Sequence, residues 1–199
     1  MAIVGRVVNA DQGYAITLPA SWLRLDFETG LAQFIAAAAL ADPSIADQCQ
    51  SSTPEELQAC LEREAAEVQD SFNDLADAGG QLAFDLETID KPFPTLVVVY
   101  VEPDATGITP ELLLAIGPAS LRAQGVVGRI QSGLRDVPAG TAVYFYYAMP
   151  PDQVANARAR QFHLLAGDTV YTVLVVGHKS DDGLVDDADA LIQSFEILP

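Results

Sequence analysis

Residues 13–22 read GYAITLPASW, and this stretch decides how the chain begins to fold. Its first half has the alternating apolar character of a strand, and Pro19 ends the strand because proline cannot donate a backbone hydrogen bond. Val4 to Asn9 has the same character, and Asp11-Gln-Gly supplies turn residues between the two runs. The sequence therefore predicts an N-terminal hairpin. Trp22, the only tryptophan, is expected to anchor the packing just after it.

The rest of the chain divides into helix-like and strand-like runs. Thr53 and Pro54 open the best-marked helix, since threonine caps a helix N-terminus and proline fits its first position. Thr109-Pro110 marks another start, although Gly117-Pro118 is expected to kink or interrupt that helix. Further helices are predicted at 30–48 and about 182–193, and strands at 22–27, 82–89, 95–101, 126–137, 141–148, 157–165 and 169–176. Successive strands indicate antiparallel pairing, so the sequence predicts an α+β fold.

Composition and charge exclude several classes of protein. The chain has 199 residues, of which 50% are hydrophobic, enough for one substantial core. Its net charge of −18 argues against binding nucleic acid or anionic lipid, since both demand a basic surface. Most of this charge lies in residues 26–90, which hold 15 acidic residues against Arg63 alone. The longest apolar run, Phe34 to Ala41, is far shorter than the roughly 20 residues of a membrane-spanning helix.

The two ends of the chain together resemble a known family. GYAITLPASW is followed much later by the hairpin ARARQFHLLAGDTVYTVLVV, the helix DADALIQ and the closing SFEIL. This combination resembles the PsbP-like family, which includes photosystem II extrinsic proteins, Ran-binding eukaryotic relatives, and bacterial exported proteins and lipoproteins. The resemblance covers residues 13–27 and about 107–198. It implies an α/β/α sandwich with a central antiparallel sheet flanked by helices, in a family whose members mostly bind or assemble rather than catalyse.

The acidic helical segment at about 28–80 matches nothing typical of that family. We therefore expect residues 1–199 to form a single PsbP-like domain with this segment as a helical insertion between the early and later strands. The insertion is the part of the chain in which features particular to this protein are expected.

Cys49 and Cys60, the only cysteines, are predicted to form a disulfide within the insertion. On one straight helix they would lie about 16 Å apart, too far for the bond. A turn at Ser51-Ser-Thr, before the helix that starts at Pro54, can bring them together. Two separate buried thiols are the alternative. A disulfide implies an oxidising compartment, so we expect an extracytoplasmic protein whose signal was removed, with a lipid anchor upstream as one possibility. A cytoplasmic location is the alternative.

No catalytic residue, metal ligand or cofactor is predicted. His163 and His178 are the only histidines, and no Gly-x-Ser-x-Gly nucleophile turn accompanies them. The acidic stretch 180–189 lacks the ligand spacing of a calcium-binding loop. Asp181 or Asp182 as a helix cap explains that stretch, because carboxylates are favoured at a helix start.

Four residues form the candidate site for a partner. Strand alternation places Tyr144 and Tyr146 on one face, and Arg158 and Arg160 together on one face of a neighbouring strand. Arginine and tyrosine are typical of binding hot spots because both bury a large area and still form hydrogen bonds. Plain cross-strand pairing on an exposed sheet face explains the same pattern.

The sequence thus predicts a non-catalytic, exported binding or assembly module that binds another protein, with its oligomeric state open. The alternative is a carrier of a small apolar ligand held between helices and sheet, suggested by the small side chains of the alanine-rich run 30–41. An enzyme is the least favoured reading.

Overall fold

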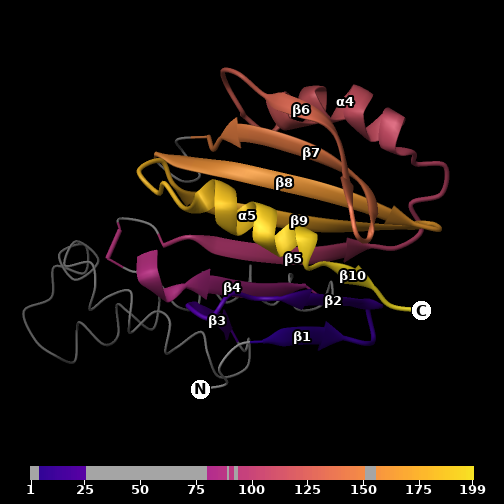
Figure 1. Ribbon diagram of the computed structural model, residues 1–199. Helices are drawn as coiled ribbons and strands as arrows, with labels where there is room; N and C mark the ends of the chain where they lie inside the picture. The colour runs from indigo at the N-terminus through magenta and orange to yellow at the C-terminus, as the bar shows by residue number, and fades with distance from the viewer. Residues whose placement is uncertain (1–4, 26–79, 89, 92–93, 151–155) are drawn as a thin grey trace, which may run out of the picture.

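The computed structural model describes residues 5–25, 80–88, 90–91, 94–150 and 156–199 (Figure 1). The insertion at about 28–80, its two predicted helices and both cysteines lie outside the described residues. The disulfide between Cys49 and Cys60 therefore stays a prediction.

The main sheet has seven strands in the order β3-β4-β5-β9-β8-β7-β6, and every neighbouring pair is antiparallel. Most neighbours in the sheet are also neighbours in the chain, and two-residue turns join β6 to β7 and β8 to β9, as the sequence predicts. Its strands are β3 (Trp22–Leu25), β4 (Gln81–Asp85), β5 (Leu96–Glu102), β6 (Gln131–Val137), β7 (Gly140–Ala148), β8 (Ala157–Ala166) and β9 (Thr169–His178). A 3-10 turn, η1 (Leu86–Thr88), follows β4.

A smaller sheet joins the two ends of the chain. It contains β1 (Arg6–Asn9), β2 (Tyr14–Thr17) and β10 (Glu196–Ile197), with β2 in the centre. The predicted N-terminal hairpin is confirmed, and the closing SFEIL segment supplies its third strand.

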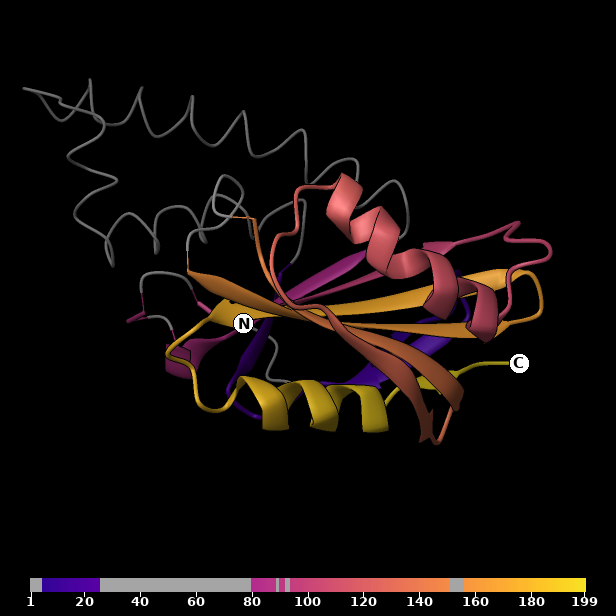
Figure 2. The same cartoon turned by 90° about the horizontal axis from the view of Figure 1, so that it is seen from above.

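The two helices of the described residues lie on opposite faces of the main sheet (Figure 2), which makes an α/β/α sandwich. Helix α4 (Pro110–Ala123) packs over β6 and β7, and helix α5 (Leu184–Gln193) packs over β9 and β8. Thr109 caps α4 as predicted, since its side chain accepts a hydrogen bond from the backbone N–H of Leu112. The expected α+β class and sandwich architecture are confirmed.

Each face of the sheet has its own hydrophobic core. On the α5 side, the small sheet and the helix bury Trp22, Phe162 and Phe195 together, so the packing role expected of Trp22 is confirmed. On the α4 side, the core is smaller and centres on Phe145 beneath Leu121.

Three local expectations need correction. Gly117-Pro118 was expected to kink or interrupt α4, and the interruption is contradicted: the helix continues through Pro118, because its packing on β7 outweighs the backbone hydrogen bond that proline removes. Strand β6 begins at Gln131 rather than Val126, since Gly125 and Gly128 adopt positive φ angles that a strand does not allow. Strand β4 ends at Asp85, where the chain turns into η1 instead of extending to Ile89.

Candidate binding groove on the arginine and tyrosine face

The four residues singled out from the sequence lie on one face of the sheet, the face that α5 covers. Tyr144 and Tyr146 pack against the core on the α5 side, whereas Phe145 and Tyr147 belong to the core beneath α4. On β8, Arg158 and Arg160 alternate with Ala157 and Ala159, which also belong to the α4-side core. The register pairs Tyr146 with Arg160 directly across β7 and β8.

Tyr146 and Arg160 form a stacked pair. The guanidinium carbon of Arg160 lies 4.1 Å from the centre of the Tyr146 ring, within the range of a cation–π interaction. The same ring lies 4.6 Å from the ring of Tyr144 and meets Phe162 edge-on at 5.9 Å. Neighbours therefore hold Tyr146 from several sides, and it in turn fixes the position of Arg160.

Gly133 on the edge strand β6 makes room for this aromatic row. A Cβ atom there would lie 2.6 Å from the hydroxyl oxygen of Tyr144 and 2.9 Å from a ring carbon. Any larger residue at position 133 would displace the ring of Tyr144, which contacts Tyr146. Because glycine has no side chain, Gly133 lets the rings of Tyr144 and Tyr146 keep their contact.

Beside this row the surface is hollowed into an open groove of about 370 Å³. Its volume is at the small end of the roughly 300–1,000 Å³ typical of ligand pockets. The groove lies between the sheet and the start of α5, and its walls come from β6, β7, β8 and the β9–α5 connection. It is lined by Arg129, Gln131, Tyr146, Tyr147, Ala148, Arg158, Ala159, Arg160, Asp181, Leu184 and Val185.

Three of the four candidate residues line the groove, and the fourth, Tyr144, contacts the lining residue Tyr146. Sequence reasoning missed the contributions of Arg129, Gln131 and Val185. The alternation of β6 could have found Gln131, which pairs with Tyr146 in the sheet. Nothing in the sequence signals Arg129 or Val185, because their place depends on how a loop and a helix pack.

The positive charge of the groove is not neutralised by described residues. The ion pairs found among them are Arg6–Glu196, Lys91–Asp181 and Arg135–Asp189, so none involves Arg129, Arg158 or Arg160. In a chain of net charge −18, three arginines with no such partner mark an unusual surface.

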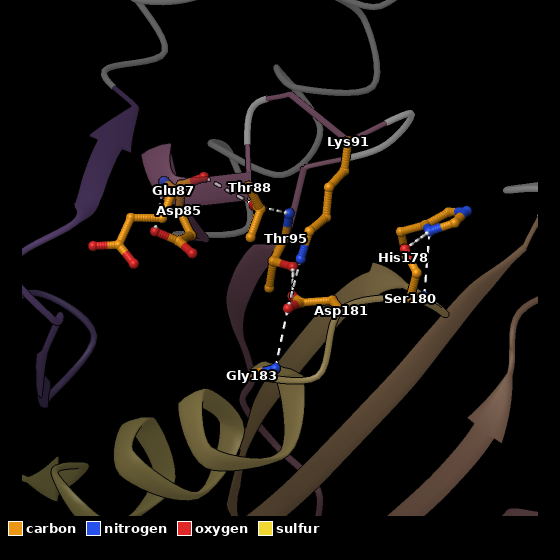
Figure 3. Close-up of polar contacts among 9 residues, drawn as sticks. All are labelled: Asp85, Glu87, Thr88, Lys91, Thr95, His178, Ser180, Asp181 and Gly183. Carbon is orange, nitrogen blue, oxygen red and sulfur yellow. Dashed lines mark hydrogen bonds and ion pairs between the residues drawn. The ribbon is translucent and has the colours of Figure 1, made fainter.

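Asp181 is the acidic residue in the lining, and other groups already occupy its carboxylate (Figure 3). Lys91 donates to it at 2.9 Å, the backbone N–H of Gly183 donates at 3.1 Å, and the hydroxyl of Thr95 donates as well. Burial acts to raise the pKa of Asp181, but these donors hold it below its usual value. The carboxylate is therefore charged at neutral pH, and it binds Lys91, Thr95 and Gly183 rather than the arginines of the groove.

The start of α5 differs from the sequence expectation. Gly183 is the N-cap residue, and neither Asp181 nor Asp182 caps the helix with its side chain. Asp181 accepts from the N–H of Gly183 instead, which orders the turn before the helix. Asp186 and Asp187 lie in the first turn, where carboxylates were expected. Burial, together with nearby negative charge on Asp85, Asp181, Asp186 and Glu87, raises the pKa of Asp187 to about 6.

The histidines take structural positions. The ring nitrogen Nδ1 of His163 lies 2.9 Å from the hydroxyl oxygen of Thr172, and burial lowers the pKa of His163 to about 4. Nδ1 of His178 lies 2.7 Å from the hydroxyl oxygen of Ser180 and accepts from the backbone N–H of the same residue, which closes a local turn. Among the described residues, no ion pair joins His163 or His178 to a carboxylate.

Among the described residues, no group of three or more His, Cys, Asp and Glu side chains is placed to hold a metal ion. Within the same part of the chain, neither helix has the length and apolar character needed to cross a membrane.

The described arrangement defines a class of fold, an α/β/α sandwich around an antiparallel sheet, and solved structures share it. Cyanobacterial PsbP (CyanoP) from Synechocystis sp. PCC 6803 aligns with a TM-score of 0.54 at 12% identity, covering 99% of this chain and 94% of that protein. The E65A mutant of Mog1 aligns with a TM-score of 0.50 at 7% identity, covering 100% and 97%.

A structure from Bacteroides thetaiotaomicron VPI-5482 has a TM-score of 0.47 at 7% identity, and this chain spans only 50% of its length. The sequence matches no protein-family model and no curated protein. At these identities the likeness to PsbP and Mog1 shows a shared fold.

Proposed function

We propose that this protein is a non-catalytic binding or assembly module of the PsbP-like fold that acts outside the cytoplasm, and that another protein docks on the groove lined by Arg129, Tyr146, Arg158 and Arg160. The proposal rests on arginines that form no ion pair with a described carboxylate, beside an ordered tyrosine row. Arginine and tyrosine dominate binding energy when a partner covers them and excludes water.

The shared fold supports a binding role, because the PsbP-like family that the sequence resembles mostly binds or assembles. A carrier of a small apolar ligand is the alternative. The cavity between the two sheets, near Ile16 and Val97, has a volume of only about 10 Å³, which is about the size needed for one water molecule. The alanine-rich run that suggested a carrier lies outside the described residues.

Site-specific photo-crosslinking tests the docking face. A photo-reactive side chain at Gln131 points to the groove face, and one at the neighbouring Ser132 points to the opposite face of the edge strand, which makes it a matched control. In an extract of the source cells, we expect a crosslinked protein from position 131 and not from position 132.

The combined changes Arg158→Gln and Tyr146→Leu should abolish this product, whereas Arg6→Gln on β1 of the smaller sheet should leave it unchanged. The captured protein must then bind the purified module in isolation. Equal products from positions 131 and 132, or a product that survives the double substitution, would overturn the proposed docking face.

A further inference from the structure

We propose that the groove recognises an acidic peptide segment in extended conformation, in which two carboxylates at alternate positions pair with Arg158 and Arg160. This inference rests on the proposed function and adds the chemistry of the partner. Arg129, from the loop before β6, supplies a third positive charge at the same groove.

The spacing of the two arginines carries the argument. Arg158 and Arg160 stand two residues apart on β8 and point to the same face, so their Cα atoms are separated by about 6.5–7 Å. An extended peptide repeats its side chains on one face at the same interval. Acidic residues at alternate positions therefore meet one guanidinium each, and each pair can form two parallel hydrogen bonds.

The stacking of Arg160 favours this distributed arrangement over a single small anion. A lone phosphate binds most tightly where several guanidinium groups converge on one point. The ring of Tyr146 holds the guanidinium of Arg160 in place at 4.1 Å, so moving that group toward Arg158 would break the cation–π contact. Arg160, held by Tyr146, and Arg158, two residues away on the same face of the strand, match two carboxylates along a peptide.

The remaining lining residues fit the same ligand. Val185 is 41% exposed at the start of α5 and offers apolar surface next to the charged groups. An apolar residue in the peptide can pack there while its acidic neighbours reach β8. Asp181 does not compete for the arginines because Lys91, Thr95 and Gly183 hold its carboxylate.

The net charge of −18 does not prevent such binding. At physiological ionic strength, charges in water are screened beyond a Debye length of about 8 Å. Acidic residues farther away than this contribute little repulsion, so the contacts made inside the groove decide the affinity.

Fluorescence anisotropy with three labelled synthetic peptides tests the inference on the full chain. The first peptide has glutamate at alternate positions separated by valine, the second has the same composition with the glutamates adjacent, and the third has glutamine in place of glutamate. We expect the first peptide to bind at least several-fold more tightly than the second, and the third to show no measurable binding.

Substitutions assign the contacts. Arg158→Gln and Arg160→Gln should each weaken binding of the first peptide roughly tenfold or more, as expected for a charged hydrogen-bonded pair. Arg6→Gln, on β1 of the smaller sheet and outside the groove lining, should leave it unchanged. Arg160→Lys keeps the charge but loses the planar guanidinium, so it should recover only part of the affinity. Thermal melting curves confirm that each variant is folded.

Equal binding of the alternate and adjacent peptides, or full displacement of the first peptide by an equimolar amount of inorganic phosphate, would overturn the inference. So would retained binding in both glutamine variants. If none of the peptides binds while the crosslinked partner still depends on Arg158, the peptide inference fails and the proposed function stands. If the peptide binds as expected but no protein is captured at position 131, the proposed function fails instead.

Discussion

Two glycines face aromatic rings of β7, one on each side of the sheet. Gly133 lies against Tyr144 on the groove side, and Gly117 in α4 lies against Phe145 on the other side. A Cβ atom at Gly117 would come within 2.2 Å of the Phe145 ring. This close approach explains why a residue that weakens a helix stands in the middle of α4, directly before Pro118.

Gly117→Ala should therefore destabilise the protein, although alanine favours helix by about 1 kcal/mol over glycine. Overpacking a core costs about 1–3 kcal/mol, and the 2.2 Å approach to the buried Phe145 ring places this site toward the upper end of that range. We expect a net loss of about 1–2 kcal/mol in the free energy of unfolding, measured by urea denaturation. Gly5→Ala is the control, since nothing lies within 4 Å of that position. An unchanged or raised stability for Gly117→Ala would show that the helix is not held against Phe145.

Asp187 makes stability depend on pH in an unusual direction. Its pKa of about 6 in the folded protein exceeds the ordinary value of 3.8, so folding favours its protonated form. The stabilisation is complete below pH 3.8 and is lost as the pH rises through about 6. Above that pH, the charged carboxylate lies partly buried among Asp85, Asp181, Asp186 and Glu87.

Asp187→Asn should accordingly raise the melting temperature at pH 7.5 and have little effect at pH 3.5. Thermal unfolding followed by circular dichroism at the two pH values measures this difference. Asp182→Asn, which changes an exposed carboxylate in the connection just before α5, is the control. A gain in stability of equal size at both pH values would contradict the electrostatic explanation.

At the scale of elements, the closing segment after α5 ties the two ends of the chain together. Ser194 accepts from the backbone N–H of Thr17 on β2, and Glu196 forms an ion pair with Arg6 on β1. Between them, Phe195 is fully buried. Its ring stacks on Tyr14 at 5.5 Å and meets Tyr171 of the main sheet edge-on at 5.8 Å. One side chain thus joins helix, small sheet and large sheet.

Phe195→Ala should lower the free energy of unfolding by about 3–5 kcal/mol, as expected for emptying a buried aromatic site. Val185→Ala, at an exposed position of α5, should change it by about 0.5 kcal/mol or less. Urea denaturation measures both. A small loss for Phe195→Ala would mean that the small sheet contributes little to the common core.

At the scale of the whole molecule, the predicted disulfide is the test of the proposed compartment. Cys49 and Cys60 are predicted to close a short loop, which would stabilise the fold by roughly 3 kcal/mol in the chain-entropy model. Intact mass measured after alkylation should show no added groups without reduction, and two added groups after reduction. If both thiols are alkylated in the unreduced protein, the cysteines are free, the disulfide prediction is wrong, and the argument for an oxidising compartment is lost.

The sequence alone predicted the elements whose signals are local. Alternation placed Tyr144 and Tyr146 on one face of β7, and it placed Arg158 and Arg160 on one face of β8. Side chains of a strand alternate whatever the strand packs against. The cap at Thr109 and the N-terminal hairpin likewise depend on neighbouring residues only. The α+β class followed from these elements and their order.

Only the tertiary structure decided the features that depend on contacts between distant segments. Packing on β7 carries α4 through Pro118, and positive φ angles at Gly125 and Gly128 shorten β6. The groove joins Arg129, the β7–β8 pair and the start of α5, which lie far apart in the chain. Sequence periodicity reports which way a side chain points, but strand order and helix packing decide what it meets there.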